Sequence, residues 1–372
     1  MGGEIGLIKD PSGPSPNLTG INGMEKYSGF RPDIEGLRAV AILLVVGYHA
    51  GVPGFGGGYI GVDVFFVLSG YLITGMLIAE VRNSGTINLA AFYARRLRRL
   101  LPALALMLMV TTLLAMVIYS PVEQRTLSST ATYTAAYISN VWFARASTEY
   151  FSAPIKSNPL LHTWSLGVEE QFYLAWPLLI LLALGKFRKK GRTPDRQRLF
   201  LAMIIIVAAS FALSLYLTNT RQPLAFFLSP PRAWEFALGG LAVLRQSDRL
   251  PVKAGTAMEL LGWTGLGGIV VAGVAFNTTT IFPGFAAGIP ALSTAFVLYA
   301  CCDNPGSHIT TALSWRPLQL IGSLSYSWYL WHWPMLAFAT TIYDRLPVRL
   351  GLLAISLAVA AASYHFVEQP IR

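Results

Sequence analysis

The sequence predicts an all-α, polytopic membrane protein. Of its 372 residues, 54% are hydrophobic and only 12% are charged, whereas a soluble domain carries about 25% charged residues. The mean hydropathy is +0.52. Long apolar runs recur along the chain, and short loops with basic residues separate them. Runs of about 20 apolar residues cross a bilayer as helices, because a helix satisfies its own backbone hydrogen bonds in lipid.

Apolar runs that can cross a membrane follow one another along most of the chain. They lie at 34–50, 60–80, 101–119, 129–144, 163–184, 199–218, 231–245, 257–276, 285–301, 318–342 and 347–367. The run at 129–144 is the most polar, so we expect it to be re-entrant or buried inside the protein, away from lipid. About ten transmembrane helices remain. Residues 1–29, rich in Gly, Pro, Ser and Asn, predict a disordered tail before one transmembrane domain at 30–372.

Basic loops set the predicted orientation. Arg82 and the arginines at 95–99 follow the second run, and another basic cluster lies at 186–198. Positively charged loops remain in the cytoplasm. Both loops are cytoplasmic only if one run between them does not cross, which is a second reason to exclude 129–144. Both termini of the chain are then cytoplasmic.

The charge and the cysteines exclude several classes of function. The net charge of +10 does not predict nucleic-acid binding, because the basic residues lie in loops beside apolar runs, as membrane orientation requires. Cys301 and Cys302 are adjacent and set no disulfide framework. The histidines form no close pair in the sequence, and no His-Glu-x-x-His motif occurs, so no metal site is predicted.

The first apolar run contains Arg38 and His49, which are costly residues inside a membrane and usually mark a working site. They lie eleven residues apart, or roughly 16 Å along a helix. A neutral imidazole can accept a proton from a hydroxyl as general base, and an arginine can offset negative charge on a donor or an oxyanion. The alternative for His49 is a structural histidine.

Two further groups fit the same chemistry. Glu169 and Glu170 are adjacent, so they point about 100° apart on a helix, and at most one faces the interior, where it can orient the imidazole of His49. The arginine cluster either anchors the membrane orientation or recognises a phosphorylated donor. That cluster consists of Arg95, Arg96, Arg98 and Arg99. Together these groups suit transfer from an internal activated donor to an external hydroxyl.

Other polar residues lie inside apolar runs and are candidates for substrate binding. They are Asp63, His162, Arg232, Glu235, Tyr326 and His332. Each also has a structural interpretation. Arg232 and Glu235 have the i,i+3 spacing of an ion pair, Asp63 can hydrogen-bond within the bundle, and Tyr326 can belong to an interfacial aromatic belt. His332 lies between two tryptophans and can be a packing residue.

Several segments together resemble the acyltransferase-3 family of membrane O-acyltransferases. The segments that carry the resemblance are 31–41 with His49, 61–71, 92–102, 162–173, 231–235 and 325–334. They occur in order, and the resemblance covers nearly the whole chain, from about residue 31 to residue 372.

The resemblance implies transfer of an acyl group, often acetyl, from cytoplasmic acyl-CoA to a hydroxyl of a glycan or glycolipid outside the bacterial inner membrane. Acyl-CoA, most often acetyl-CoA, is then the donor, and no metal is implied. The family's Arg-x10-His motif falls on Arg38 and His49, with the histidine essential. Its Arg-x-Arg motif falls best on Arg96 and Arg98, which are expected to bind CoA phosphates. Its acidic segment falls on the Glu169–Glu170 pair.

The variant of the motif at 162–173 resembles members that carry an extracytoplasmic SGNH-type domain after the membrane part. This sequence ends at 366–372, where such members continue, so we expect either a truncated chain or a protein that acts alone or with a separate SGNH-type partner. Two alternatives remain to acyl transfer by this chain itself. They are transport of an acyl donor or lipid, in which Arg38 and His49 would gate or relay protons, and an acyl relay to a separate transferase.

Overall fold

The computed structural model describes residues 30–148, 157–184, 196–246, 255–302, 306–340 and 345–371. Within these ranges the chain is helical and contains no strand. The segment Arg31–Arg372 forms one compact unit. The predicted tail at 1–29 and most of the basic cluster at 186–198 lie outside the described residues.

The helices of the first half of the unit follow closely on one another. They are α2 (Pro32–His49), η1 (Gly58–Ile60), α3 (Gly61–Ser84), α4 (Leu89–Ile118), α5 (Pro121–Ala135), α6 (Ser139–Ala146), η3 (Leu161–Thr163) and α7 (Trp164–Leu184). The second half continues with helices of more varied length. They are α8 (Arg196–Thr220), α9 (Gln222–Phe227), η4 (Pro230–Arg232), α10 (Ala233–Gln246), α11 (Thr256–Ala275), α12 (Gly288–Cys302), α13 (His308–Leu313), α14 (Arg316–Ser323), α15 (Ser325–Thr340), α16 (Leu346–Ser363), the π-helical η5 (Tyr364–Glu368) and α17 (Gln369–Ile371).

Among the described residues, 6 helical segments are long and apolar enough to cross a membrane. They are Gly58–Ser84, Leu89–Ile118, Leu161–Leu184, Arg196–Thr220, Thr256–Ala275 and Leu346–Ile371. The chain is therefore a multi-pass membrane protein, while the total of about ten crossings stays a prediction. The other predicted crossings coincide with four regions of the structure. One is α2, which carries three charged residues, and two are the short helices α10 and α12. The last covers α14 and α15, which are separated at Leu324.

The run at 129–144 is not one continuous helix. Tyr137 has a φ of 56°, a left-handed conformation that ends α5 and separates it from α6. The run is buried on one side only, because Thr130, Asn140 and Phe143 are 0% exposed while Tyr133, Ile138 and Val141 are 39%, 39% and 48% exposed. The prediction of a buried segment therefore holds for part of the run, and the re-entrant interpretation stays a prediction. On the buried side, Thr134 hydrogen-bonds to Thr163 at 3.0 Å.

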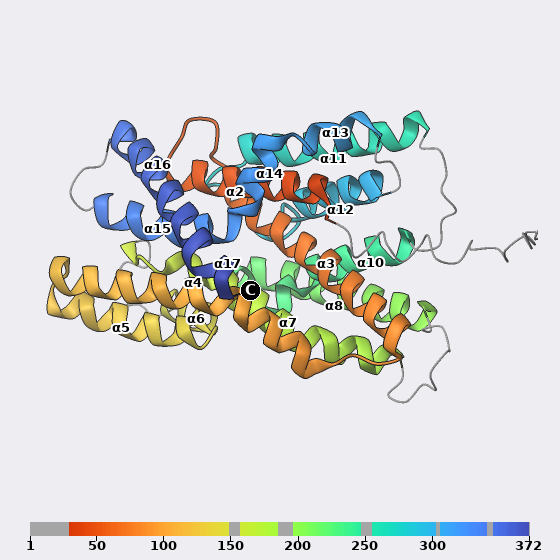
Figure 1. Ribbon diagram of the computed structural model, residues 1–372, viewed down its shortest axis with the longest axis horizontal. Helices are drawn as coiled ribbons and strands as arrows, with labels where there is room; N and C mark the ends of the chain where they lie inside the picture. Colours follow the sequence, from red (N-terminus) through yellow and green to blue (C-terminus); the bar gives the residue numbers. More distant parts are fainter. Residues whose placement is uncertain are drawn as a thin grey trace, which may run out of the picture. The chain divides into compact units, whose positions relative to one another are not determined.

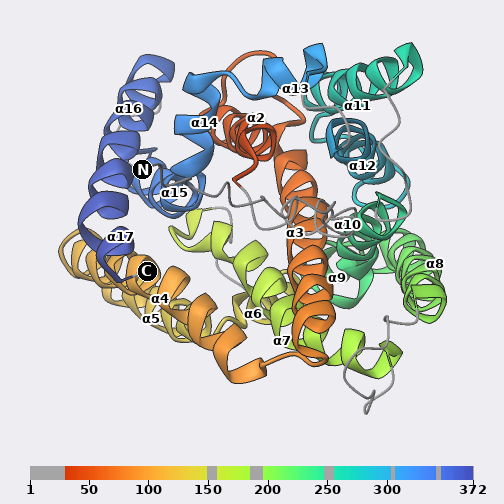
Figure 2. The same cartoon turned by 45° about the vertical axis from the view of Figure 1, so that its right-hand side comes forward.

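The helix that carries the two predicted active-site residues is α2. It begins with Pro32 at its first position, where the missing N–H costs nothing. It ends just before Gly51, whose φ of 67° suits glycine at the end of a helix, so His49 lies in the last turn. α2 packs against α3, α14 and α15, and Figure 2 shows it among these three helices.

Among the described helices, α3 and α10 make the most extensive contact, and they lie side by side in Figure 1. The contact depends on Gly70 and Gly239. A Cβ added to Gly70 would overlap the carbonyl group of Phe236, and one added to Gly239 would overlap that of Val67. Small residues let membrane helices approach backbone to backbone, and here they bring the polar side chains of both helices together.

Candidate active site

Two histidines that are far apart in the sequence meet at the C-terminal end of α2. Nδ1 of His49 lies 2.8 Å from Nε2 of His332, on α15. The two rings are nearly parallel, at 15°, and the ring of Trp333 lies 4.7 Å from that of His49. The prediction that the histidines form no close pair therefore holds only along the sequence, because the fold brings together residues 283 positions apart.

A second layer surrounds this pair. Nδ1 of His332 donates a hydrogen bond to the carbonyl oxygen of Trp328 at 3.0 Å. His162 lies with its ring 5.7 Å from that of His332. Its backbone carbonyl accepts a 2.8 Å hydrogen bond from the Tyr329 hydroxyl. His332 and His162 are 0% and 2% exposed, whereas His49 is partly exposed, so His49 is the histidine of the three that offers access to a substrate.

Glu169 lies in a different cluster from the one predicted. The hydroxyl groups of Ser69 and Tyr173 both donate hydrogen bonds to Oε1 of Glu169. The expected contact between Glu169 and His49 is not the one that orients the imidazole. Nδ1 of His49 contacts His332 instead. The reason is distance along α7, because Glu169 follows His162 by seven residues, or about 10 Å of helix.

The arginine cluster has an inward and an outward side. Arg96 and Arg99 are partly buried, while Arg95 and Arg98 are exposed. The guanidinium of Arg96 lies 5.0 Å from the ring centre of Tyr173. Nε of Arg99 is buried with no hydrogen-bond partner among the described residues. The inward pair is therefore Arg96 and Arg99, which are three residues apart. The resemblance favoured Arg96 and Arg98, which are two residues apart.

Arg38 lies on the same side of the unit as the inward arginines. It forms an ion pair with Glu35 at 3.0 Å and interacts electrostatically with Arg99 and Glu169. Glu170 in turn interacts electrostatically with Arg96 and Arg99. The Arg38 end of α2 is thus a cationic region edged by carboxylates, and the His49 end is a cluster of imidazoles.

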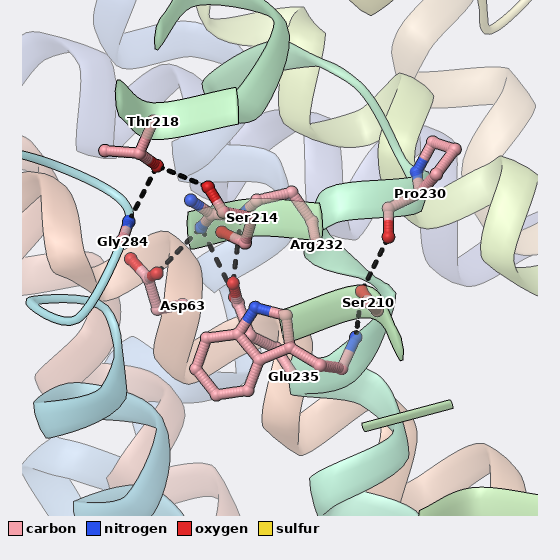
Figure 3. Close-up of polar contacts among 9 residues, drawn as sticks. Asp63, Ser210, Ser214, Thr218, Pro230, Arg232, Glu235 and Gly284 are labelled. Atoms are coloured by element: carbon pink, nitrogen blue, oxygen red, sulfur yellow. Dashed lines mark hydrogen bonds and ion pairs between the residues drawn. The ribbon is translucent and has the colours of Figure 1, made fainter. Parts of the chain in front are cut away.

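The predicted pair Arg232 and Glu235 forms an ion pair, at 2.9 Å between Nε and Oε1. Asp63 joins it, with Oδ1 at 2.7 Å from Nη2 of Arg232. Figure 3 shows the guanidinium between the two carboxylates, with Ser210 and Thr218 making separate hydrogen bonds nearby. All three charged side chains are at most 1% exposed, so this triad joins α3 to η4 and the start of α10 inside the protein.

Tyr326 also has a structural partner, because its hydroxyl donates to the carbonyl oxygen of Leu100 on α4 at 2.8 Å. Sequence reasoning expects Ser69 to hydrogen-bond within the bundle but does not identify Glu169 as its partner, and it missed the roles of Tyr173 and Trp328. Tyr173 follows Glu169 by four residues on α7, a spacing that could have identified it as a partner, whereas only the packing of α3 on α7 makes Ser69 a partner of Glu169. Among the described residues, no group of three or more His, Cys, Asp or Glu side chains is arranged to hold a metal ion.

Fold and site together define a multi-pass membrane protein with ionisable groups at both ends of one internal helix. The acyltransferase domain model of the acyltransferase-3 family matches residues 31–366, so the chain belongs to that family of acyltransferases. The expectation drawn from the sequence motifs is confirmed. No solved structure matches the chain significantly.

The relatives are longer proteins, and the match to this chain covers only part of each of them. YrhL of Bacillus subtilis (strain 168), which has the provisional name peptidoglycan O-acetyltransferase, is 34% identical over 361 residues, covering 93% of this chain and 56% of the relative. The peptidoglycan O-acetyltransferase OatA of Listeria monocytogenes is 31% identical over 355 residues, covering 92% and 56%. The O-acetyltransferase OatA of Staphylococcus aureus is 32% identical over 354 residues, covering 92% and 57%. The chain thus spans about half the length of these relatives.

Proposed function

We propose that this domain transfers an acyl group, most often acetyl, from cytoplasmic acyl-CoA to a hydroxyl of a glycan or glycolipid on the other side of the bacterial inner membrane. Peptidoglycan is the first acceptor to test, because two relatives are named for it. The observation that carries the proposal is the arrangement of α2, with Arg38 near the inward arginines and His49 in the histidine cluster.

The donor would be held at the Arg38 end. Phosphate groups of CoA need guanidinium partners, and Arg96, Arg99 and Arg38 provide three within one cationic region. The buried Nε of Arg99, which has no described partner, supports an anion as its missing ligand. The distance from Arg38 to His49, roughly 16 Å along the helix, is of the order of an extended pantetheine arm. The thioester would then reach the histidine cluster.

At that cluster His49 would act as general base. The acceptor hydroxyl oxygen forms a bond to the acyl carbonyl carbon, its proton moves to His49, and the carbon–sulfur bond breaks. The departing thiolate then takes the proton from His49, which restores the neutral imidazole. His162, which is buried with its ring 5.7 Å from that of His332, would line the acceptor site behind the other two histidines. Asp63, Arg232, Glu235, Tyr326 and His332 would shape the site around it.

The test uses the purified chain with acetyl-labelled acetyl-CoA and peptidoglycan fragments. We expect labelled ester in the glycan, and a loss of at least about 100-fold in rate for His49→Ala, the usual contribution of a general base. His308→Ala, at an exposed histidine, is the matched control and should keep full activity. Undiminished transfer by His49→Ala would overturn the assignment of the base.

The same assay separates the alternatives. A transporter moves the donor or a lipid across a vesicle membrane and leaves its covalent structure unchanged. A relay releases labelled acyl groups to an added SGNH-type transferase but not to the glycan alone. The relatives' greater length supports testing the relay, since about half of each relative lies outside the matched region.

A further inference from the structure

We infer that His332 is a positioning residue that fixes the tautomer of His49, so that Nε2 of His49 is the atom that accepts the substrate proton. This inference rests on the proposed function, because it assigns a role within the same site. It follows from two hydrogen bonds in series, from His49 to His332 and from His332 to the backbone of Trp328.

The two hydrogen bonds can have only one donor-to-acceptor direction, from His49 to His332 and from His332 to Trp328. A carbonyl oxygen accepts hydrogen bonds and never donates them, so the 3.0 Å contact between Nδ1 of His332 and the oxygen of Trp328 requires a hydrogen on Nδ1. In a neutral imidazole the other nitrogen is then an acceptor. Nε2 of His332 therefore accepts, and its 2.8 Å contact with Nδ1 of His49 requires the hydrogen to lie on His49. The remaining nitrogen of His49, Nε2, has a free lone pair.

A cationic His332 would reverse the second bond, but its surroundings oppose a charge. The side chain is 0% exposed, and a buried charge without a partner is costly. The rings around it belong to His49, His162 and Tyr329, none of which supplies a negative charge at neutral pH. Its described contacts include no carboxylate, since Glu169 is engaged with Ser69 and Tyr173. The neutral form thus fits the site.

The series also stabilises the protonated form of His49. When Nε2 of His49 takes the proton from a hydroxyl, His49 becomes an imidazolium whose Nδ1–H points at His332. Neutral His332 accepts that hydrogen bond at Nε2, which stabilises the charge on His49 while Nδ1–H of His332 stays on the Trp328 carbonyl. The arrangement performs the task that a carboxylate performs beside the histidine of a hydrolase triad, namely to select the tautomer and stabilise the protonated ring.

The first experiment is spectroscopic and needs no substrate. The full chain is labelled with ¹⁵N-histidine in detergent micelles, and long-range nitrogen–proton correlations distinguish a hydrogen on Nδ1 from one on Nε2. The chain has only 5 histidines, so single substitutions assign the signals. We expect both His49 and His332 to carry hydrogen on Nδ1. A hydrogen on Nε2 of His49 in the unmodified chain would overturn the inference.

A matched pair of variants then tests the role of His332. His332→Phe keeps a planar ring but removes the acceptor, so we expect His49 to gain the form with hydrogen on Nε2, and kcat to fall by about 100-fold with little change in KM for acetyl-CoA. His332→Gln can place a carbonyl oxygen near the lost Nε2, and we expect it to recover at least tenfold of kcat and the original tautomer. An unchanged His49 tautomer in a folded His332→Phe would overturn the inference.

The outcomes for the two proposals differ. If His49→Ala keeps its transferase activity, the proposed base is wrong, yet the tautomer spectrum still reports whether His332 orders the ring. If the spectrum contradicts the predicted tautomer while His49→Ala is inactive, only the inference about His332 fails. A cation on His332 would be seen directly as hydrogens on both of its nitrogens, and it would also contradict the inference.

Discussion

Arg96 and Arg98 look equivalent in the sequence, but α4 turns them to different environments. Arg96 lies over the ring of Tyr173 at 5.0 Å, and Arg98 is exposed. Residues three or four apart share a helix face and residues two apart do not, so Arg99 rather than Arg98 accompanies Arg96. The donor contacts proposed for this cluster therefore belong to the Arg96–Arg99 face.

This difference predicts unequal effects on donor binding. Arg96→Ala and Arg99→Ala should each weaken acetyl-CoA binding by about 10- to 100-fold, since a hydrogen bond to a charged group contributes about 1.5–3 kcal/mol. Arg98→Ala, the matched control on the outward face, should change the dissociation constant less than about threefold. Calorimetric titration of detergent-solubilised protein measures all three. Equal losses for Arg98 and Arg99 would mean that the cluster acts only through its overall charge.

Sequence reasoning at the residue scale succeeded where a single helix decided the outcome. Arg232 and Glu235 are close because i,i+3 residues of one helix are neighbours, and the ion pair is present. It did not foresee the contacts of Glu169 with Ser69 and of His332 with His49, in which the partner comes from another helix. The distance between α2 and α15 depends on packing that no single segment encodes, so the His49–His332 contact was not predictable from spacing.

At the scale of elements, the triad of Asp63, Arg232 and Glu235 joins two helices that glycines already hold at close range. One guanidinium faces two carboxylates, and Oδ2 of Asp63 has no hydrogen-bond partner among the described residues. Removing one member of a buried ion pair strands the remaining charge, which costs about 3–5 kcal/mol. Loss of the cation of the triad should therefore lower the free energy of unfolding strongly, and loss of one negative charge should lower it little.

We expect Arg232→Gln to lower the free energy of unfolding by about 3–5 kcal/mol, because two carboxylates then remain buried without a cation. Glu235→Gln is nearly isosteric, keeps an acceptor for Arg232 and removes the excess negative charge, so it should cost less than about 1 kcal/mol. Equilibrium unfolding in mixed micelles measures both. A larger loss for Glu235→Gln than for Arg232→Gln would contradict the charge argument.

Element boundaries were predictable where local chemistry sets them. Gly51 ends α2, and the Ser120–Glu123 capping box starts α5, both of which follow from side-chain and backbone preferences. The run at 129–144 was correctly distinguished as unusual because of its polarity. Its exposed outer face was not foreseen, since composition does not tell which side of a helix meets the protein.

At the scale of the whole molecule, the number of crossings is the main open prediction. Six described segments satisfy the criteria for a span, and α2 does not, because Asp33, Glu35 and Arg38 lie in it. These charges have protein partners, Arg31 for Asp33 and Arg38 for Glu35. Paired charges inside a bundle are tolerated at membrane depth, so α2 can still cross, as the predicted orientation requires.

Cysteine accessibility tests that orientation. In a chain with Cys301 and Cys302 replaced by alanine, we expect Gly54→Cys to react with a membrane-impermeant maleimide added outside intact cells. Asn83→Cys should react only after the membrane is permeabilised, because α3 lies between the two positions and Arg82 favours the cytoplasmic side. Both sites are exposed, so reactivity reports their side of the membrane. Labelling of both positions in intact cells would contradict a crossing by α3.

The pairing of His49 with His332 has a consequence for the timing of synthesis. The two residues are 283 positions apart, and at about 5–20 residues per second a ribosome needs roughly 15–60 s to proceed from one to the other. During that interval α2 can already be inserted while α15 does not yet exist, so the nascent chain has the proposed base without the residue proposed to orient it. An unfinished or prematurely terminated chain would therefore be unable to consume acyl-CoA efficiently, and activity would begin only when nearly the whole domain has entered the membrane.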